Sequence, residues 1–209
     1  MINKQQIRAI LLALFVPLLL NSSSYLLTDE ILKPGASELI NKIGNELSKK
    51  TGINAYVLAT KESFPVGFNL VEYSKKYEQK MNKPYVLFIF APHAKITKNS
   101  TTTGRVGIIP SSNELRKLYD YEDVRDAGID IISVKDSNTK EDKHNVGIVQ
   151  AFSELADNIA NSKNVEMTTT IPNDTLYLIW VLKILVYSGS IVILWIFLIR
   201  PKLQRGKHE

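Results

Sequence analysis

The chain of 209 residues contains no cysteine. Thiol catalysis, thiolate metal sites and thioester lipidation are therefore excluded. The lack of disulfides is compatible with an exported domain, because about 150 residues bury an adequate core without them. The middle of the chain also lacks an excess of either charge, with 19 basic and 20 acidic residues between positions 25 and 174. Since it has no basic stripe and no nucleic-acid motif, nucleic-acid binding is not indicated.

The net charge of +5 arises at the two ends of the chain, beside two apolar segments. The C-terminal segment, Leu176 to Ile199, has 24 residues with Lys183 as its one charge, and Arg200-Pro-Lys202 follows it. At about 1.5 Å per residue it is roughly 36 Å long, enough to cross a hydrocarbon core of about 30 Å. We therefore expect a transmembrane helix over 176–199 and a basic cytoplasmic tail over 200–209.

The N-terminal apolar segment, Ala9 to Leu20, follows Lys4 and Arg8 and precedes Asn21-Ser-Ser-Ser24. This arrangement is typical of a secretory signal peptide, with cleavage after Ser24. The alternative is an uncleaved anchor over residues 1–24, although this segment is short for a membrane span. In both cases the sequence predicts that the middle of the chain is exported, to the periplasm or its equivalent. The short signal, together with the family layout described below, favours a bacterium, with the helix in the inner membrane.

The predicted membrane helix carries two features that indicate a partner. A charge near the centre of a bilayer costs about 2.5–3.5 kcal/mol, so Lys183 either extends to the headgroups or meets an acidic group of another membrane protein. Ser188, Gly189 and Ser190 are small residues at which another helix can approach closely. We therefore predict contact with an inner-membrane protein or complex, or a homo-oligomer formed through this helix.

The middle of the chain has the length of one domain. Pro34 at the start, apolar positions at helical spacing and Gly52 at the end predict a helix over 36–50, and Asn69 is placed to cap a second helix over 70–81. The other predicted elements are strands over 53–59, 84–91 and 105–109, a short helix over 113–119, a strand over 128–134 and a helix over 146–159. This order predicts an α/β fold with a mixed sheet sandwiched between helices. The domain covers 25–162, and a linker over 163–175 leads to the membrane helix.

The layout resembles the TPM domain family, which includes thylakoid lumen phosphatase-like, photosystem repair and receptor-auxiliary proteins. The residues that carry the resemblance are Leu27-Thr-Asp29-Glu-Ile-Leu32, Thr51-Gly52-Ile53, Val86–Ala91 and Arg105-Val-Gly-Ile-Ile109, and bacterial members share the C-terminal membrane anchor. The chain departs from the family at Met81-Asn82-Lys83-Pro84, where members carry Asp-Asn-Gly. It also departs at Pro110-Ser-Ser-Asn113, where they have a glycine-rich turn. Both departures weaken the transfer of phosphatase activity.

Acidic residues are densest just after the predicted short helix: Asp120, Glu122, Asp123 and Asp126, with Asp130 nearby. In a helix, Asp120 and Asp123 share one face. With Asp29 and Asn82 they form a candidate site for Ca²⁺ or Mg²⁺, which prefer oxygen ligands. The alternative is a solvated acidic surface near Arg116, Lys117 and Arg125.

No catalytic residue is assigned. Ser111 and Ser112 suit either anion binding or the capping of the following helix, and capping is the commoner role. His93 and His144 are expected in exposed polar loops. Two functions remain open. One is a membrane-anchored protein that assists the assembly, repair or regulation of an inner-membrane complex. The other is a metal-dependent phosphatase of the periplasm.

Overall fold

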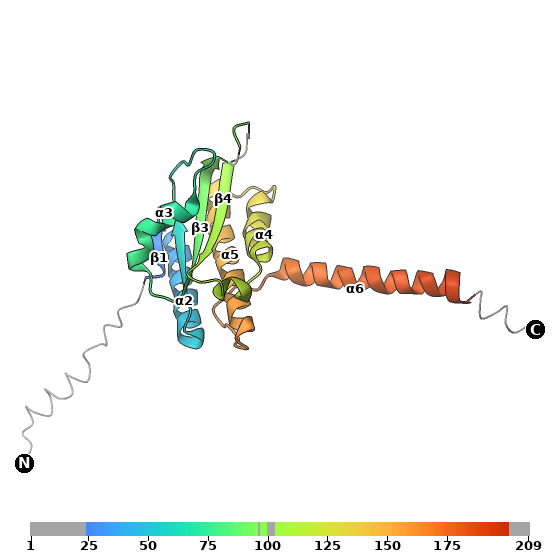
Figure 1. The fold of residues 1–209 in the computed structure, drawn as a ribbon. Coiled ribbons are helices and arrows are strands. Elements are labelled where there is room, and N and C mark those ends of the chain that lie inside the picture. The colour runs from blue at the N-terminus through green and yellow to red at the C-terminus, as the bar shows by residue number, and fades with distance from the viewer. Residues whose placement is uncertain (1–23, 96, 100–102, 201–209) are drawn as a thin grey trace, which may run out of the picture. The chain divides into compact units, whose positions relative to one another are not determined.

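A computed structural model describes residues 24–95, 97–99 and 103–200 (Figure 1), and within the last helix it includes the side chains of 184–197. The chain forms two compact units, Met1–Thr170 and Ile171–Glu209. The predicted signal segment, except for Ser24, and the predicted tail, except for Arg200, lie outside the described residues.

The first unit is built on a four-stranded mixed sheet with the order β1-β2-β3-β4. The strands are β1 (Leu26–Asp29), β2 (Asn54–Ala59), β3 (Tyr85–Lys95) and β4 (Thr103–Pro110). β1, β2 and β3 are parallel, and β4 is antiparallel to β3. The predicted strands over 84–91 and 105–109 are therefore confirmed, and they pair with each other. β2 and most of β3 are buried on both faces, which explains why their sequences show no polar alternation.

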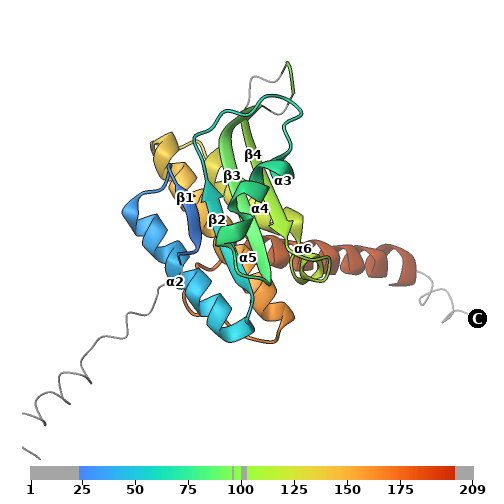
Figure 2. The same cartoon turned by 60° about the vertical axis from the view of Figure 1, so that its left-hand side comes forward.

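Helices cover both faces of this sheet (Figure 2). α2 (Pro34–Thr51) and α5 (Lys140–Ser162) lie on one face, and α3 (Leu70–Ser74), with the 3-10 helix Lys75–Lys80, lies on the other. The predicted α/β class, with a mixed sheet between helices, is thus confirmed. The core on the α3 side is a cluster rich in aromatic side chains, among them Tyr56, Phe64, Tyr73 and Tyr85.

Local signals set several helix boundaries. Pro34 occupies the start of α2, and Gly52 ends it with a φ of 73°, a left-handed conformation that glycine adopts without strain. The Asn69 side chain accepts hydrogen bonds from the backbone N–H groups of Val71 and Glu72 and so caps α3. These three predictions are confirmed.

α4 (Tyr121–Ser133) packs against α5 through two glycines. A Cβ atom added at Gly128 would lie 2.9 Å from the carbonyl oxygen of Gly147 and 3.1 Å from the Cβ of Ala151. Glycine at both positions therefore permits the close approach of the two helices.

A buried asparagine joins the beginning of the domain to α5. Asn145 is 6% exposed. Its Oδ1 accepts a hydrogen bond from the backbone N–H of Lys33 at 2.6 Å, and its Nδ2 donates to the carbonyl of Ile31 at 3.1 Å. The segment between β1 and α2 is therefore fixed to a helix more than a hundred residues away in the sequence.

Several predicted elements are wrong. The predicted strand over 128–134 lies mostly within α4, because Val124, Ala127 and Gly128 are buried at helical spacing and packing overrides the β-branched run. The predicted helix over 146–159 begins six residues earlier than expected, at Lys140, with Thr139 as its N-cap. The predicted helix over 113–119 is a 3-10 turn of four residues, Leu115–Leu118, and only the first part of 70–81 is α-helical.

The second unit contains α6 (Asp174–Leu194), which continues as a π-helix over Trp195–Ile199. In the part of the chain that the structure describes, no helix has the length and apolar character needed to cross a membrane.

Candidate functional site

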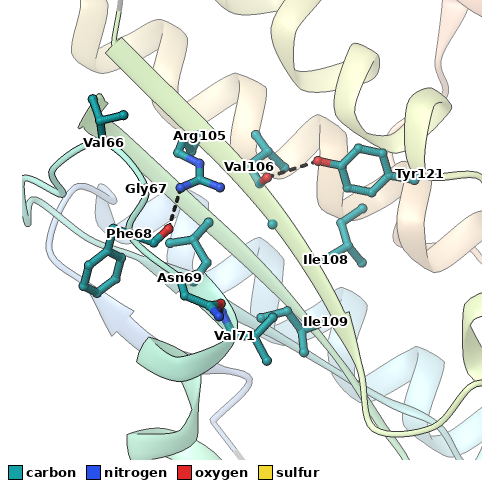
Figure 3. A pocket seen from close by; sticks show the side chains of 12 residues that line it. Val66, Gly67, Phe68, Asn69, Val71, Arg105, Val106, Ile108, Ile109 and Tyr121 are labelled. Carbon is teal, nitrogen blue, oxygen red and sulfur yellow. Dashed lines mark hydrogen bonds between the residues drawn. The ribbon is translucent and has the colours of Figure 1, made fainter. Parts of the chain in front are cut away.

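A groove of about 690 Å³ lies beside β4 (Figure 3). Three separate parts of the chain line it: residues 66–71 at the start of α3, residues 105–109 of β4, and Tyr121 at the start of α4. Most of the lining is apolar, and Val66 and Val71 are 38% and 49% exposed. Arg105 is the one charged residue of the lining.

Two hydrogen bonds connect β4 to the walls of the groove. The Arg105 guanidinium donates through Nη1 to the carbonyl of Phe68 at 2.7 Å, and the Tyr121 hydroxyl donates to the carbonyl of Val106 at 3.1 Å (Figure 3). The strand is thereby fixed to the α3 segment on one side and to α4 on the other. An apolar groove with a few polar groups along a strand suits an extended peptide segment.

The predicted metal residues Asp120 and Asp123 lie together at the start of α4. Asp120 is the N-cap, and its Oδ1 accepts hydrogen bonds from the backbone N–H groups of Glu122 at 2.8 Å and Asp123 at 3.3 Å. Asp123 lies in the first turn, where negative charge complements the helix dipole. Both residues therefore have structural roles that account for their position.

The other two predicted metal residues lie at opposite ends of the parallel strands. Asp29 is the last residue of β1 and pairs with Ala59 of β2, which in turn pairs with Phe90 of β3. Asn82 precedes β3 and lies near the level of Tyr85, because its carbonyl accepts a hydrogen bond from Asn54, the residue that pairs with Tyr85. Tyr85 is five residues before Phe90, so about 17 Å separates the two levels. The structure does not bring Asp29 and Asn82 together. Among the described residues, no three His, Asp or Glu side chains form a group that could hold a metal ion.

Ser111 and Ser112 do not cap a helix, contrary to the capping interpretation. Ser111 extends the pairing of β3 with β4: its N–H donates to the carbonyl of Tyr85 at 2.8 Å, and its Oγ accepts from the Tyr85 N–H at 2.9 Å. The Ser112 side chain is hydrogen-bonded to Glu114 and lowers the pKa of that carboxyl. The N-cap of the 3-10 turn is Glu114, which makes no capping bond through its side chain.

The two histidines differ from each other in environment. His93 is exposed, as expected, but it lies in β3 and not in a loop. His144 is partly buried in α5, and its ring packs edge-on against Phe90 at 5.4 Å between centroids. Burial lowers the pKa of His144, and the nearby His93 and Lys140 lower it further. The prediction of an exposed loop residue is wrong for His144 because α5 begins earlier than the sequence pattern indicated.

An interaction that the sequence did not reveal holds the segment after α5. Glu46 of α2 accepts hydrogen bonds from the N–H and Oγ1 of Thr168 at 2.9 and 2.8 Å through Oε1, and from those of Thr169 at 2.8 and 2.5 Å through Oε2. We call this set of contacts the threonine clamp (Glu46, Thr168 and Thr169). Thr170 donates to Asp157 at 2.8 Å. The run of threonines, predicted to be part of a linker, is therefore attached to the domain.

The contacts of the threonine clamp strongly lower the pKa of Glu46. The Glu46 side chain is 11% exposed and pairs with Lys50 at 2.7 Å. Burial opposes ionisation of Glu46, but hydrogen bonds from Lys50, Thr169 and Thr168 outweigh it and lower its pKa to about 2. The carboxylate is thus the form that the fold stabilises.

The predicted partner residues of the membrane segment lie in α6. Ser188 and Ser190 donate their hydroxyl groups to the carbonyls of Leu185 at 3.0 Å and Val186 at 2.8 Å. A Cβ added at Gly189 would meet nothing within 4 Å among the described atoms. Lys183 lies in the same helix, and its side chain is outside the described residues.

Comparisons with known proteins do not assign the chain to a family. No model of a protein family matches it, and no curated protein is similar to it. The geometry of the groove and of the threonine clamp therefore carries the argument about function.

Proposed function

We propose that this chain is a membrane-anchored binding protein of the TPM type. In this proposal residues 25–162 lie in the periplasm and assist the assembly, repair or regulation of a protein complex of a bacterial inner membrane. The apolar segment 176–199 is the anchor, and the tail from Arg200 is cytoplasmic. The charge distribution supports this orientation, because the basic excess lies beside the apolar segments.

The observation that carries the proposal is the threonine clamp. A free linker would let a domain move over a wide range relative to its anchor. Here Glu46 holds Thr168 and Thr169 on α2, and Asp157 of α5 holds Thr170. The chain therefore leaves the domain at a fixed point, close before the apolar segment. Such an arrangement suits a domain that works near a membrane surface.

The small residues of α6 support a partner within the membrane. Ser188 and Ser190 satisfy their hydroxyl groups within their own helix, so a neighbouring helix does not have to supply a hydrogen bond. Gly189 lies between them with open space around it. Close approach of a second helix at Gly189 follows the small-residue packing common in membranes.

Site-specific photo-crosslinking in membranes of the producing cells tests the proposal. We expect a photoreactive residue at Gly189 to crosslink a defined protein. The same residue at Ile191, about 200° around the helix, should give lipid adducts instead. Replacement of Lys183 by Leu should lower the yield of the protein adduct, whereas Lys183→Arg should keep it. Release of the full chain from membranes by carbonate, or equal adducts at both positions, would refute the proposal.

A further inference from the structure

β4 is an edge strand whose outer side is unpaired among the described residues. In an antiparallel pair, successive residues point their N–H and C=O groups alternately toward and away from the partner strand. The N–H of Ser111 bonds to Tyr85, so Ser111 points toward β3. Counting back along the register, Ile109, Gly107 and Arg105 also point toward β3. The backbone groups of Val106, Ile108 and Pro110 therefore point outward, into the groove.

One of these outward groups already has a partner. The carbonyl of Val106 accepts the hydroxyl of Tyr121. Between Val106 and Pro110, the outward donors that remain are the N–H groups of Val106 and Ile108, and the outward acceptors are the carbonyls of Ile108 and Pro110. Pro110 has no N–H to donate. The edge thus presents equal numbers of donors and acceptors.

We propose that this edge pairs with the β4 strand of a second copy of the chain, antiparallel, about a two-fold axis at Ile108. The Ile108 N–H of each copy then donates to the Ile108 carbonyl of the other, and the Val106 N–H donates to the Pro110 carbonyl. In this register Val106 of one copy lies opposite Pro110 of the other. The Val106 carbonyl already accepts the Tyr121 hydroxyl, and Pro110 has no N–H that would need this carbonyl as an acceptor. Every outward group between Val106 and Pro110 then has a partner, and the Val106 carbonyl keeps its hydrogen bond from Tyr121.

The charges along the strand agree with this register. Residues near a two-fold axis lie close to the same residues of the other copy, so a charged residue at the axis would repel its counterpart. The residue there is Ile108, and Arg105 is three positions away. Arg105 and its copy are therefore six residues apart along the paired strands, about 20 Å, and each lies opposite a Ser111.

The walls of the groove can contribute apolar contact. When the two-fold axis is perpendicular to the sheet, the equivalent faces of the two copies lie on the same side of the joined sheet. The exposed Val66 and Val71 of both copies are therefore on one side. Pairing of one short strand buries less than the roughly 1,000 Å² that a stable interface needs as a minimum. The dimer is therefore weak in dilute solution. Its strength in the cell rests on the proposed anchoring, which confines both copies to one membrane and raises their effective concentration.

Single cysteines test the register directly, because the native chain has none. In the full chain, Ile108→Cys places two cysteines opposite each other with Cα atoms about 5.5 Å apart, within the range of a disulfide. Val106→Cys is the matched control, since Val106 and its copy are about 13 Å apart along the strands. Under mild oxidation we expect a covalent dimer from Ile108→Cys and little from Val106→Cys. Equal yields from both, or a dimer from neither, would overturn the proposal.

A second measurement covers the case in which Ile108→Cys does not fold. Val106→Pro removes one outward N–H and leaves the pairing with β3 intact, as edge strands tolerate. We expect dissociation of the full-length dimer in detergent, measured by sedimentation, to become easier by about tenfold or more. An unchanged dimer, or a wild-type chain that is monomeric at every concentration, would overturn the proposal and leave the edge to a strand of another protein. Carbonate release of the chain would refute the anchoring alone.

Discussion

Replacement of Glu46 by Gln should destabilise the domain through the threonine clamp. The side chain of Gln has nearly the same shape but carries no charge, so it loses the ion pair with Lys50 and part of the hydrogen bonding to Thr168 and Thr169. The pKa of Glu46 falls from 4.5 to about 2 in the folded chain. At about 1.36 kcal/mol per pKa unit, this shift corresponds to about 3 kcal/mol of stability.

The effect should depend on pH in a defined direction. Because the folded pKa is depressed, the stabilisation is fully present above pH 4.5 and is lost as the pH falls toward 2. Roughly 1.4 kcal/mol of it should remain at pH 3. The difference in the free energy of unfolding between wild type and Glu46→Gln should therefore be largest at pH 7 and less than half as large at pH 3.

Urea unfolding of the full chain in detergent, followed by circular dichroism, measures this difference. Amide hydrogen exchange at Thr168 and Thr169 reports on the clamp itself and should accelerate in the variant. Glu38→Gln is the control, since Glu38 lies on the same helix, pairs with Lys42 and has a side chain that is 67% exposed. A cost that does not change with pH, or an equal cost for Glu38→Gln, would refute the reasoning.

Three further substitutions test other features. Gly128→Ala should cost about 1–3 kcal/mol in urea unfolding, because its Cβ would lie 2.9 Å from the Gly147 carbonyl oxygen, whereas Gly35→Ala should be neutral or stabilising. The pKa of His144, followed by NMR, should lie below the ordinary value of 6.5, and protonation should destabilise the fold as the pH falls through 6.5. Asp120→Ala should cost about 1 kcal/mol in urea unfolding through loss of the α4 cap, and Asp120→Asn should be nearly neutral because Asn caps as well as Asp.

Each of these has an outcome that would count against it. Equal effects of Ala at Gly128 and Gly35 would mean that α4 and α5 move apart without cost. A His144 pKa at or above that of an exposed histidine would contradict the burial against Phe90. If Asp120→Asn were as damaging as Asp120→Ala, the carboxylate would have a role beyond capping, and titration of the full chain with Ca²⁺ would follow.

Elements with strong local signals were predictable from the sequence. Pro34, Gly52 and Asn69 each act through the backbone conformation or hydrogen bonding of their own segment, so their roles do not depend on the rest of the fold. The error over 128–134 has the opposite origin. That run has β-branched residues typical of a strand, but Gly128 packs on Gly147 of a helix later in the chain, and this contact decides its structure.

The candidate site was less predictable. The groove beside β4 joins segments around Phe68, Arg105 and Tyr121, and none of them carries a recognisable motif. The threonine clamp joins Glu46 to residues more than 120 positions later, a distance that no periodicity reveals. One local signal was available: Thr139 three residues before Asp142 has the spacing of an N-terminal cap and marks the true start of α5.

The attachment of Asn145 to Lys33 has a consequence for how the domain is completed during synthesis. All four strands precede Asn145, yet the helix that covers part of α2 begins only at Lys140. Synthesis of the 112 residues between Lys33 and Asn145 takes about 6–22 s at translation rates of about 5–20 residues per second. During that interval the surface of α2 that packs against α5 in the complete domain has nothing from its own chain to pack against. A truncated product that ends before Asn145 should therefore bind chaperones and be degraded.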